Sequence, residues 1–104
     1  MIPALLLLLP GVPDAPTVHK DRKVTVSNTN ATVAIRRIWR GDMNGEGPWI
    51  EMTLDAPIPP DRRATFSLGN GTSCLYEFKM QFTDGYEQIV QNVNVCRGDT
   101  IKAT

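Results

Sequence analysis

The chain has 104 residues, which suits one small domain, and 41% of them are hydrophobic. Its 11 basic and 11 acidic residues balance, so bulk charge gives no reason to expect a nucleic-acid partner or an acidic substrate. One histidine and two cysteines leave few side chains for catalysis or metal binding.

The chain opens on an apolar leader, with five consecutive leucines at residues 5–9. This run is too short to span a bilayer, which takes about 20 residues. It is typical of a secretory signal peptide, although no basic residue precedes it and no clean cleavage site follows. An uncleaved anchor and a disordered apolar tail are the alternatives. We expect a signal peptide and its Pro-rich exit at 1–16, a linker at 17–22 and one domain at 23–104.

The first expected strand covers residues 24–27, where β-branched residues are frequent and valines alternate with hydroxyl residues. A turn rich in asparagine follows at residues 28–31. The only histidine, His19, falls in the predicted linker, so it is not expected to act as a catalytic base or a metal ligand.

The second expected strand covers residues 32–39. Val33 and Ile35 share one parity, but Ile38 has the other, so we expect a bulge or bend between them, near residues 36–37. A helix is the alternative, because Ile35, Ile38 and Trp39 also have helical spacing.

Residues 41–53 are rich in glycine and acidic side chains. We expect a loop with a short helical turn at residues 49–53. Trp49 is the candidate contact residue of this loop, because tryptophan is enriched at binding hot spots. Its ring could equally cap the core of the domain.

The same loop gives an alternative hypothesis of calcium binding. Asp42, Asn44 and Glu46 alternate, as oxygen ligands do at the start of a calcium loop. The bidentate glutamate that should close the motif is missing, because Thr53 occupies that position. The primary prediction is therefore no metal and no cofactor.

Three prolines exclude residues 54–61 from a central strand, so this segment is predicted to be an extended crossover. Residues 64–68 form the third expected strand, with Phe66 and Leu68 directed inward. A glycine-rich turn follows at residues 69–72.

The clearest signal in the chain is a hairpin between residues 74 and 96. The first arm predicts a half-buried strand with one solvated side. Its apolar face carries Tyr76, Phe78, Met80 and Phe82, and its other face carries Leu75, Glu77, Lys79 and Gln81. An Asp-Gly pair at residues 84–85 predicts a tight turn.

The second arm of the hairpin breaks the alternation. Ile89, Val93 and Val95 share one parity while Val90 has the other, and a bulge at residues 91–92 would reconcile them.

The two cysteines, Cys74 and Cys96, lie at the far ends of this hairpin. They match a disulfide of an exported domain, although an uninterrupted ladder would place them on opposite faces. The same bulge, or the twist of the strand ends, must bring them together. Two unrelated buried thiols are the alternative.

After a turn at residues 98–99, residues 100–104 are expected to add a last edge strand. Together these elements predict an all-β fold, a small antiparallel β-sandwich of about six strands with one short helical turn in the 41–53 loop.

Several segments of the chain, taken in the order in which they occur, resemble those of a family of small exported bacterial β-sandwich domains. The members of this family have no established activity. The most specific segments are Cys-Leu-Tyr at residues 74–76 and Asn-Val-Asn-Val-Cys at residues 92–96. The likeness covers residues 24–101, and it implies a sandwich with this cysteine pair outside the cytosol. In the 41–53 loop the chain departs from the family, which tends to have serine and aspartate around the tryptophan.

We therefore expect a periplasmic or secreted module that is monomeric and not an enzyme, and that binds a protein or a cell-surface partner or has a structural role. Asp42, Asn44, Glu46 and Trp49 form its candidate binding loop. A calcium-binding β module and a small secreted enzyme inhibitor are the alternatives.

Overall fold

The computed structural model describes residues 16–43 and 47–104. The expected leader and the candidate ligands Asn44 and Glu46 lie outside these residues. The described part contains strands and no helix, as the all-β prediction requires, and so none of its elements could cross a membrane as a helix. Its seven strands are β2 (His19–Asn28), β3 (Ile35–Asp42), β4 (Ile50–Met52), β5 (Arg63–Gly71), β6 (Leu75–Phe82), β7 (Glu87–Asn94) and β8 (Thr100–Ala103).

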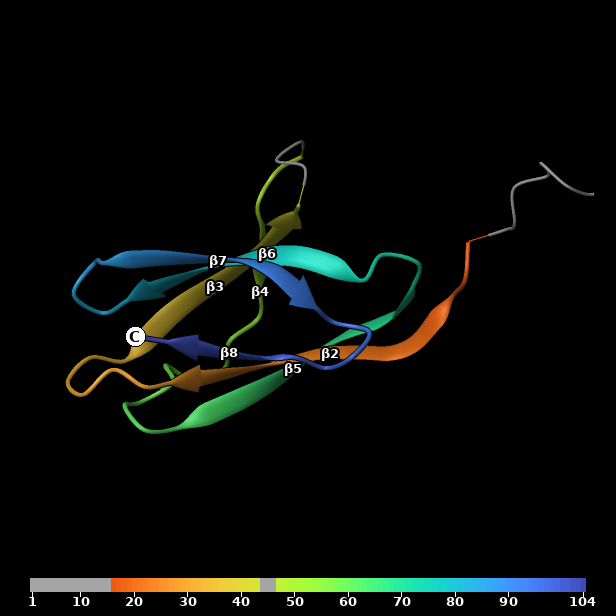
Figure 1. The fold of residues 1–104 in the computed structure, drawn as a ribbon. Coiled ribbons are helices and arrows are strands. Elements are labelled where there is room, and N and C mark those ends of the chain that lie inside the picture. Colours follow the sequence, from red (N-terminus) through yellow and green to blue (C-terminus); the bar gives the residue numbers. More distant parts are fainter. Residues whose placement is uncertain (1–15, 44–46) are drawn as a thin grey trace, which may run out of the picture.

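The strands form two sheets that pack face to face as a β-sandwich (Figure 1). One sheet has the order β5-β2-β8 and the other the order β4-β3-β6-β7. β8 lies at a sheet edge as predicted, but it pairs with β2 in parallel. The expectation of a purely antiparallel sandwich is therefore wrong at this one pair. Parallel pairing is possible because a long connection, and not a hairpin, joins β2 to β8.

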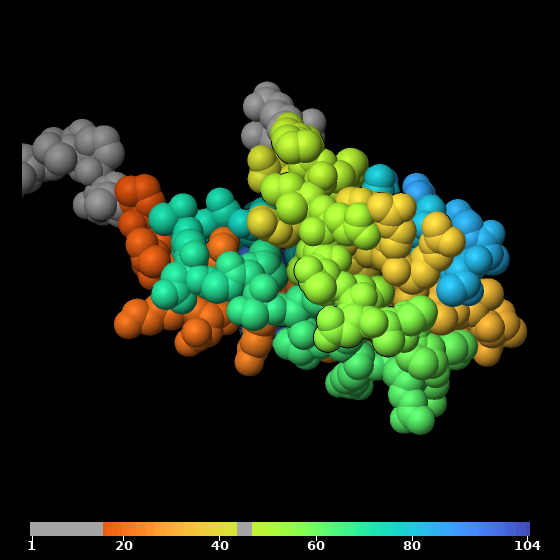
Figure 2. All heavy atoms as spheres, turned by 180° about the vertical axis from the view of Figure 1, so that it is seen from behind, coloured from red at the N-terminus to blue at the C-terminus, as the bar shows by residue number. Residues whose placement is uncertain are grey.

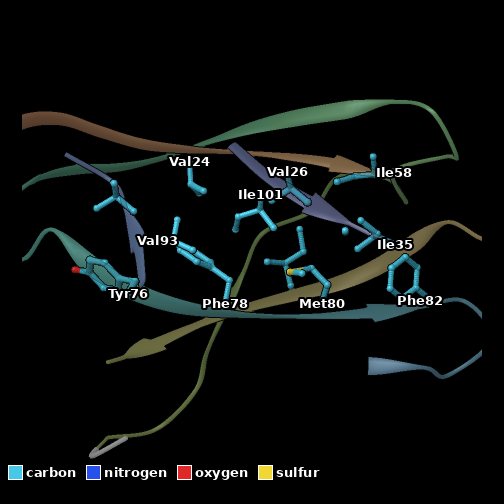
Figure 3. Close-up of a cluster of buried hydrophobic side chains, with 13 residues drawn as sticks. Val24, Val26, Ile35, Ile58, Tyr76, Phe78, Met80, Phe82, Val93 and Ile101 are labelled. Carbon is cyan, nitrogen blue, oxygen red and sulfur yellow. The ribbon is translucent and has the colours of Figure 1, made fainter. Parts of the chain in front are cut away.

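The core lies between the two sheets. Val24 and Val26 of β2 and Ile101 of β8 point toward Phe78 and Met80 of β6 (Figure 3). All five side chains are fully or almost fully buried. The alternation predicted for β6 is confirmed at its apolar face, whose residues Tyr76, Phe78, Met80 and Phe82 are all buried, but Glu77 of the opposite face is buried as well.

The hairpin β6–β7 also confirms the expected bulge. Phe78 pairs with Val90 but Tyr76 pairs with Val93, so two residues of β7 oppose one residue of β6. Asn92, inside the bulge, has a φ of 61°, a left-handed conformation that asparagine tolerates better than most residues. The extra residue lets Val90 and Val93 both face the core.

This bulge has a consequence for the two cysteines. Cys74 and Cys96 form a disulfide with a Cα–Cα distance of 5.1 Å. The cross-link ties the start of β6 to the segment after β7, so the predicted pairing is confirmed. A disulfide of this kind is typical of proteins that reach an oxidising compartment.

A second predicted bulge lies in β3. Ile35 pairs with Phe82 and Arg37 with Gln81, so Arg36 is the additional residue. Ile35 and Ile38 are both fully buried as a result. The segment is a strand, as predicted, and the helical alternative is wrong.

The short helical turn expected at residues 49–53 is wrong. Ile50–Met52 instead forms β4, which pairs antiparallel with β3 from Ile38 to Arg40. Three residues are too few to show a periodicity, and the backbone hydrogen bonds offered by β3 decide the conformation.

β2 is longer than the expected first strand and begins at His19. His19 therefore lies in a strand and not in a linker. Arg22, also upstream of residues 24–27, is 7% exposed. Its guanidinium donates to three carbonyl oxygens and one hydroxyl, those of Leu68, Gly69, Ser73 and Tyr76. A buried charge held by this many acceptors fixes the end of the sandwich where β2 begins.

Asn28 closes the opposite end of β2. It is fully buried, and its side-chain nitrogen donates to the carbonyls of Val33 at 3.0 Å and Ile58 at 2.9 Å. Its side-chain oxygen accepts from the backbone of Asn30 at 2.9 Å. One satisfied amide thus joins β2, the following turn and the crossover.

Candidate functional site

The outer face of the four-stranded sheet carries both tryptophans of the chain. Trp39 lies on β3, opposite Glu51 of β4 on one side and Lys79 of β6 on the other. Trp49 lies immediately before β4. We call the surface formed by Arg37, Trp39, Trp49, Glu51 and Lys79 the tryptophan face.

A lysine lies between the two indole rings. The Lys79 Nζ is 4.7 Å from the centre of the Trp39 ring and 4.9 Å from that of Trp49. At these distances the ammonium interacts favourably with the electron-rich faces of both rings. Lys79 therefore contacts two aromatic side chains, one on β3 and one immediately before β4.

Trp39 is also contacted by an arginine. The Arg37 guanidinium lies 4.8 Å from the ring centre and also forms an ion pair of 2.7 Å with Glu51. Hydrogen bonds from this guanidinium lower the pKa of the Glu51 carboxyl and raise the pKa of Arg37. The pair is exposed, so it orients the arginine more than it stabilises the fold.

Trp49 reaches this face because of a glycine. A Cβ atom on Gly41 would lie 3.0 Å from two carbons of the Trp49 ring. Only a residue without a side chain lets the indole lie this close to the backbone of β3. Trp49 thus covers the sheet from outside, and both tryptophans remain partly exposed.

Neighbouring side chains extend the surface toward β7. Ile89, which pairs opposite Lys79, is 53% exposed. Glu77 was expected on the wet side of β6, but it is only 9% exposed and accepts a hydrogen bond of 3.1 Å from Gln91. The tryptophan face therefore has an aromatic centre, with polar and aliphatic residues around it.

The predicted binding loop is brought together only in part. Asp42 is exposed at the end of β3, and Trp49 belongs to the tryptophan face. Asn44 and Glu46 lie outside the described residues, so the calcium hypothesis stays a prediction. The alternation of β6 predicted that Lys79 lies on the solvated face, but nothing in the sequence indicated that it contacts both indoles, because the three residues come from separate segments of the chain.

A second surface lies on the open side of the sandwich, where the yellow-green crossover passes between β3 and β5 (Figure 2). Two adjoining hollows of about 310 and 440 Å³ share Thr53, Thr65 and Phe66. Arg62 and Arg63 line the first hollow. Both hollows are shallow openings between edge strands and offer an alternative place for a ligand.

Comparisons of the chain with protein-family models, curated proteins and solved structures find no match. The likeness to small exported bacterial domains thus stays a prediction.

Proposed function

We propose that this protein is a non-catalytic binding module, periplasmic or secreted, that contacts a protein or cell-surface partner through the tryptophan face. The observation that carries the proposal is the position of Trp39 and Trp49. Both lie outside the core, on an exposed sheet face, where charged side chains hold them.

The composition of this face supports a contact role. Tryptophan and arginine are enriched among the few residues that contribute most to binding. Here their rotamers are restricted before any partner arrives, because Arg37 and Lys79 lie against the rings. Restricting side chains in advance lowers the entropy lost on binding.

The disulfide supports the proposed location. Cys74 and Cys96 are joined across the end of β6–β7, and such cross-links persist where the environment is oxidising. The apolar leader at residues 1–16 is consistent with export to the periplasm or the medium.

A co-sedimentation assay with the cell-envelope fraction, paired with a pull-down from the soluble exported fraction, tests the proposal. The oxidised wild type should bind to one fraction, and Trp39→Ala/Trp49→Ala should bind at least tenfold more weakly. The matched control, Thr25→Ala/Thr100→Ala, alters the outer face of the other sheet and should bind like the wild type.

Three results would contradict the proposal. The first is equal binding by the tryptophan variant and the wild type, and the second is binding by neither. The third is a loss of binding only in Arg62→Ser/Arg63→Ser, which would move the contact to the hollows beside β5.

A further inference from the structure

The side chain of His19 lies beside the disulfide. One nitrogen of its imidazole and the Sγ atoms of Cys74 and Cys96 all lie within 4.8 Å of one another, and each of the three residues is partly exposed. His19 comes from β2 in one sheet, whereas the cysteines flank β6 and β7 in the other. The cluster therefore joins the two sheets at one end of the sandwich.

A bulge in β2 places the histidine there. His19 pairs with Gly71 and Arg22 with Gly69, so two residues of β2 oppose one of β5. Asp21, inside the bulge, has a φ of 55°, and its N–H donates to the Asn70 side chain at 3.0 Å.

The bulge changes which face His19 occupies. In a regular strand, residue 19 would share the outer face with Lys23 and Thr25. The extra residue moves it to the inner side, where the buried Arg22 and the disulfide lie. Bulges that re-aim a side chain in this way are over-represented next to functional sites.

The backbone around the cysteines is also held in place. Arg22 Nη1 donates to the carbonyl oxygen of Ser73 at 2.7 Å, and the same oxygen lies 3.8 Å from Cys96 Sγ. Because Arg22 is buried and anchored by further acceptors, it holds the residue before Cys74 through a hydrogen bond that does not involve the S–S bond.

We propose that the reduced protein binds one Zn²⁺ ion through Cys74 Sγ, Cys96 Sγ and the His19 imidazole. Two thiolates and one imidazole form a donor set that zinc accepts, with water in the fourth position of the tetrahedron. The disulfide and the metal exclude each other, so the site is controlled by oxidation state. This inference does not depend on the tryptophan face.

The chemistry requires a dithiol as reductant. The dithiol transfers two electrons and two protons to the disulfide: the S–S bond breaks, each Sγ becomes a thiol, and the dithiol becomes a disulfide. Zn²⁺ then displaces the two thiol protons, and the neutral imidazole nitrogen donates its lone pair. Exchange with an external disulfide reverses the step: the Cys74–Cys96 S–S bond forms again, the external disulfide accepts the two electrons and becomes a dithiol, and Zn²⁺ is released.

The test titrates the reduced full chain with Co²⁺, whose thiolate charge-transfer absorption reports sulfur coordination, and then displaces it with Zn²⁺. Wild type should bind one ion, and His19→Gln should bind at least tenfold more weakly. The control His19→Gln/Lys20→His keeps an imidazole one residue along the strand and should not restore affinity. Cys74→Ser/Cys96→Ser should give no charge-transfer band.

A melting experiment distinguishes metal binding by the folded protein from metal binding by the unfolded chain. Zn²⁺ should raise the Tm of the reduced wild type, since a ligand of the folded state stabilises it, and should leave the Tm of the oxidised protein unchanged. Equal affinity in wild type and His19→Gln, restoration by Lys20→His, or a Tm that fails to rise with Zn²⁺ would each overturn the proposal.

Discussion

The two sheets of this sandwich differ most on their outer faces. The face of the three-stranded sheet presents short polar and basic residues: Lys23, Thr25, Ser27, Arg63, Thr65, Ser67, Thr100 and Lys102. The face of the four-stranded sheet presents two tryptophans held by Arg37 and Lys79. Both sheets contribute apolar side chains to the same core, so the core does not explain the difference. A strand face that only contacts water does not require two tryptophans. This difference between the two outer faces supports a contact role for the second.

Removing the disulfide, which cross-links only one of the two sheets, should have the largest effect on stability. Cys74→Ser/Cys96→Ser should lower the free energy of unfolding by about 3 kcal/mol, the value of the chain-entropy model for a loop of this length. Amide exchange should accelerate more in β7 than in β2. Urea denaturation and exchange monitored by NMR measure both effects, and equal acceleration in the two sheets would contradict this account.

The second prediction concerns binding by the two outer faces. Trp39→Ala/Trp49→Ala should weaken partner binding at least tenfold, which corresponds to about 1.4 kcal/mol, and Thr25→Ala/Thr100→Ala should not. Co-sedimentation measures both variants side by side. If the threonine variant lost as much affinity as the tryptophan variant, the two faces would not differ in function.

A smaller effect is expected from the lysine between the rings. Lys79→Met keeps most of the apolar stem but removes the ammonium, so it should cost about 0.5–1 kcal/mol of stability. The fluorescence of both tryptophans should change with it. Lys102→Met, on the other outer face, is the matched control and should leave the emission spectrum as in wild type.

The smallest effect is a pH dependence. Because Arg37 lowers the pKa of Glu51 in the folded state, the contribution of this pair is complete above the ordinary value of 4.5 and is lost as pH falls through the lowered pKa. Glu51→Gln removes the contribution. The stability difference between wild type and Glu51→Gln, measured by urea denaturation, should therefore shrink as pH falls below about 4.5. A constant difference across this range would show that the ion pair is not its cause.

Much of the sandwich could be predicted, because parity carries information when a strand is half buried. The mismatch of Val90 with Val93 located the bulge in β7, and that of Ile35 with Ile38 located the bulge in β3. Both bulges are observed. In each case an apolar side chain on the wrong face required an extra residue.

The missed features have a different origin. β4 is too short for a periodic pattern, and its conformation depends on hydrogen bonds from β3. The bulge that re-aims His19 involves charged and polar residues, so no apolar mismatch marked it in the sequence. The arrangement of Lys79 between two indoles joins three segments and has no local signature.

The most direct test of the account is the accessibility of the tryptophans in the free, oxidised protein. Trp39 and Trp49 are the only two in the chain, so intrinsic fluorescence reports on the tryptophan face alone. We expect emission that acrylamide quenches in free wild type, with both rings contributing. Strongly blue-shifted emission that resists the quencher would place the indoles in the interior and contradict a contact role.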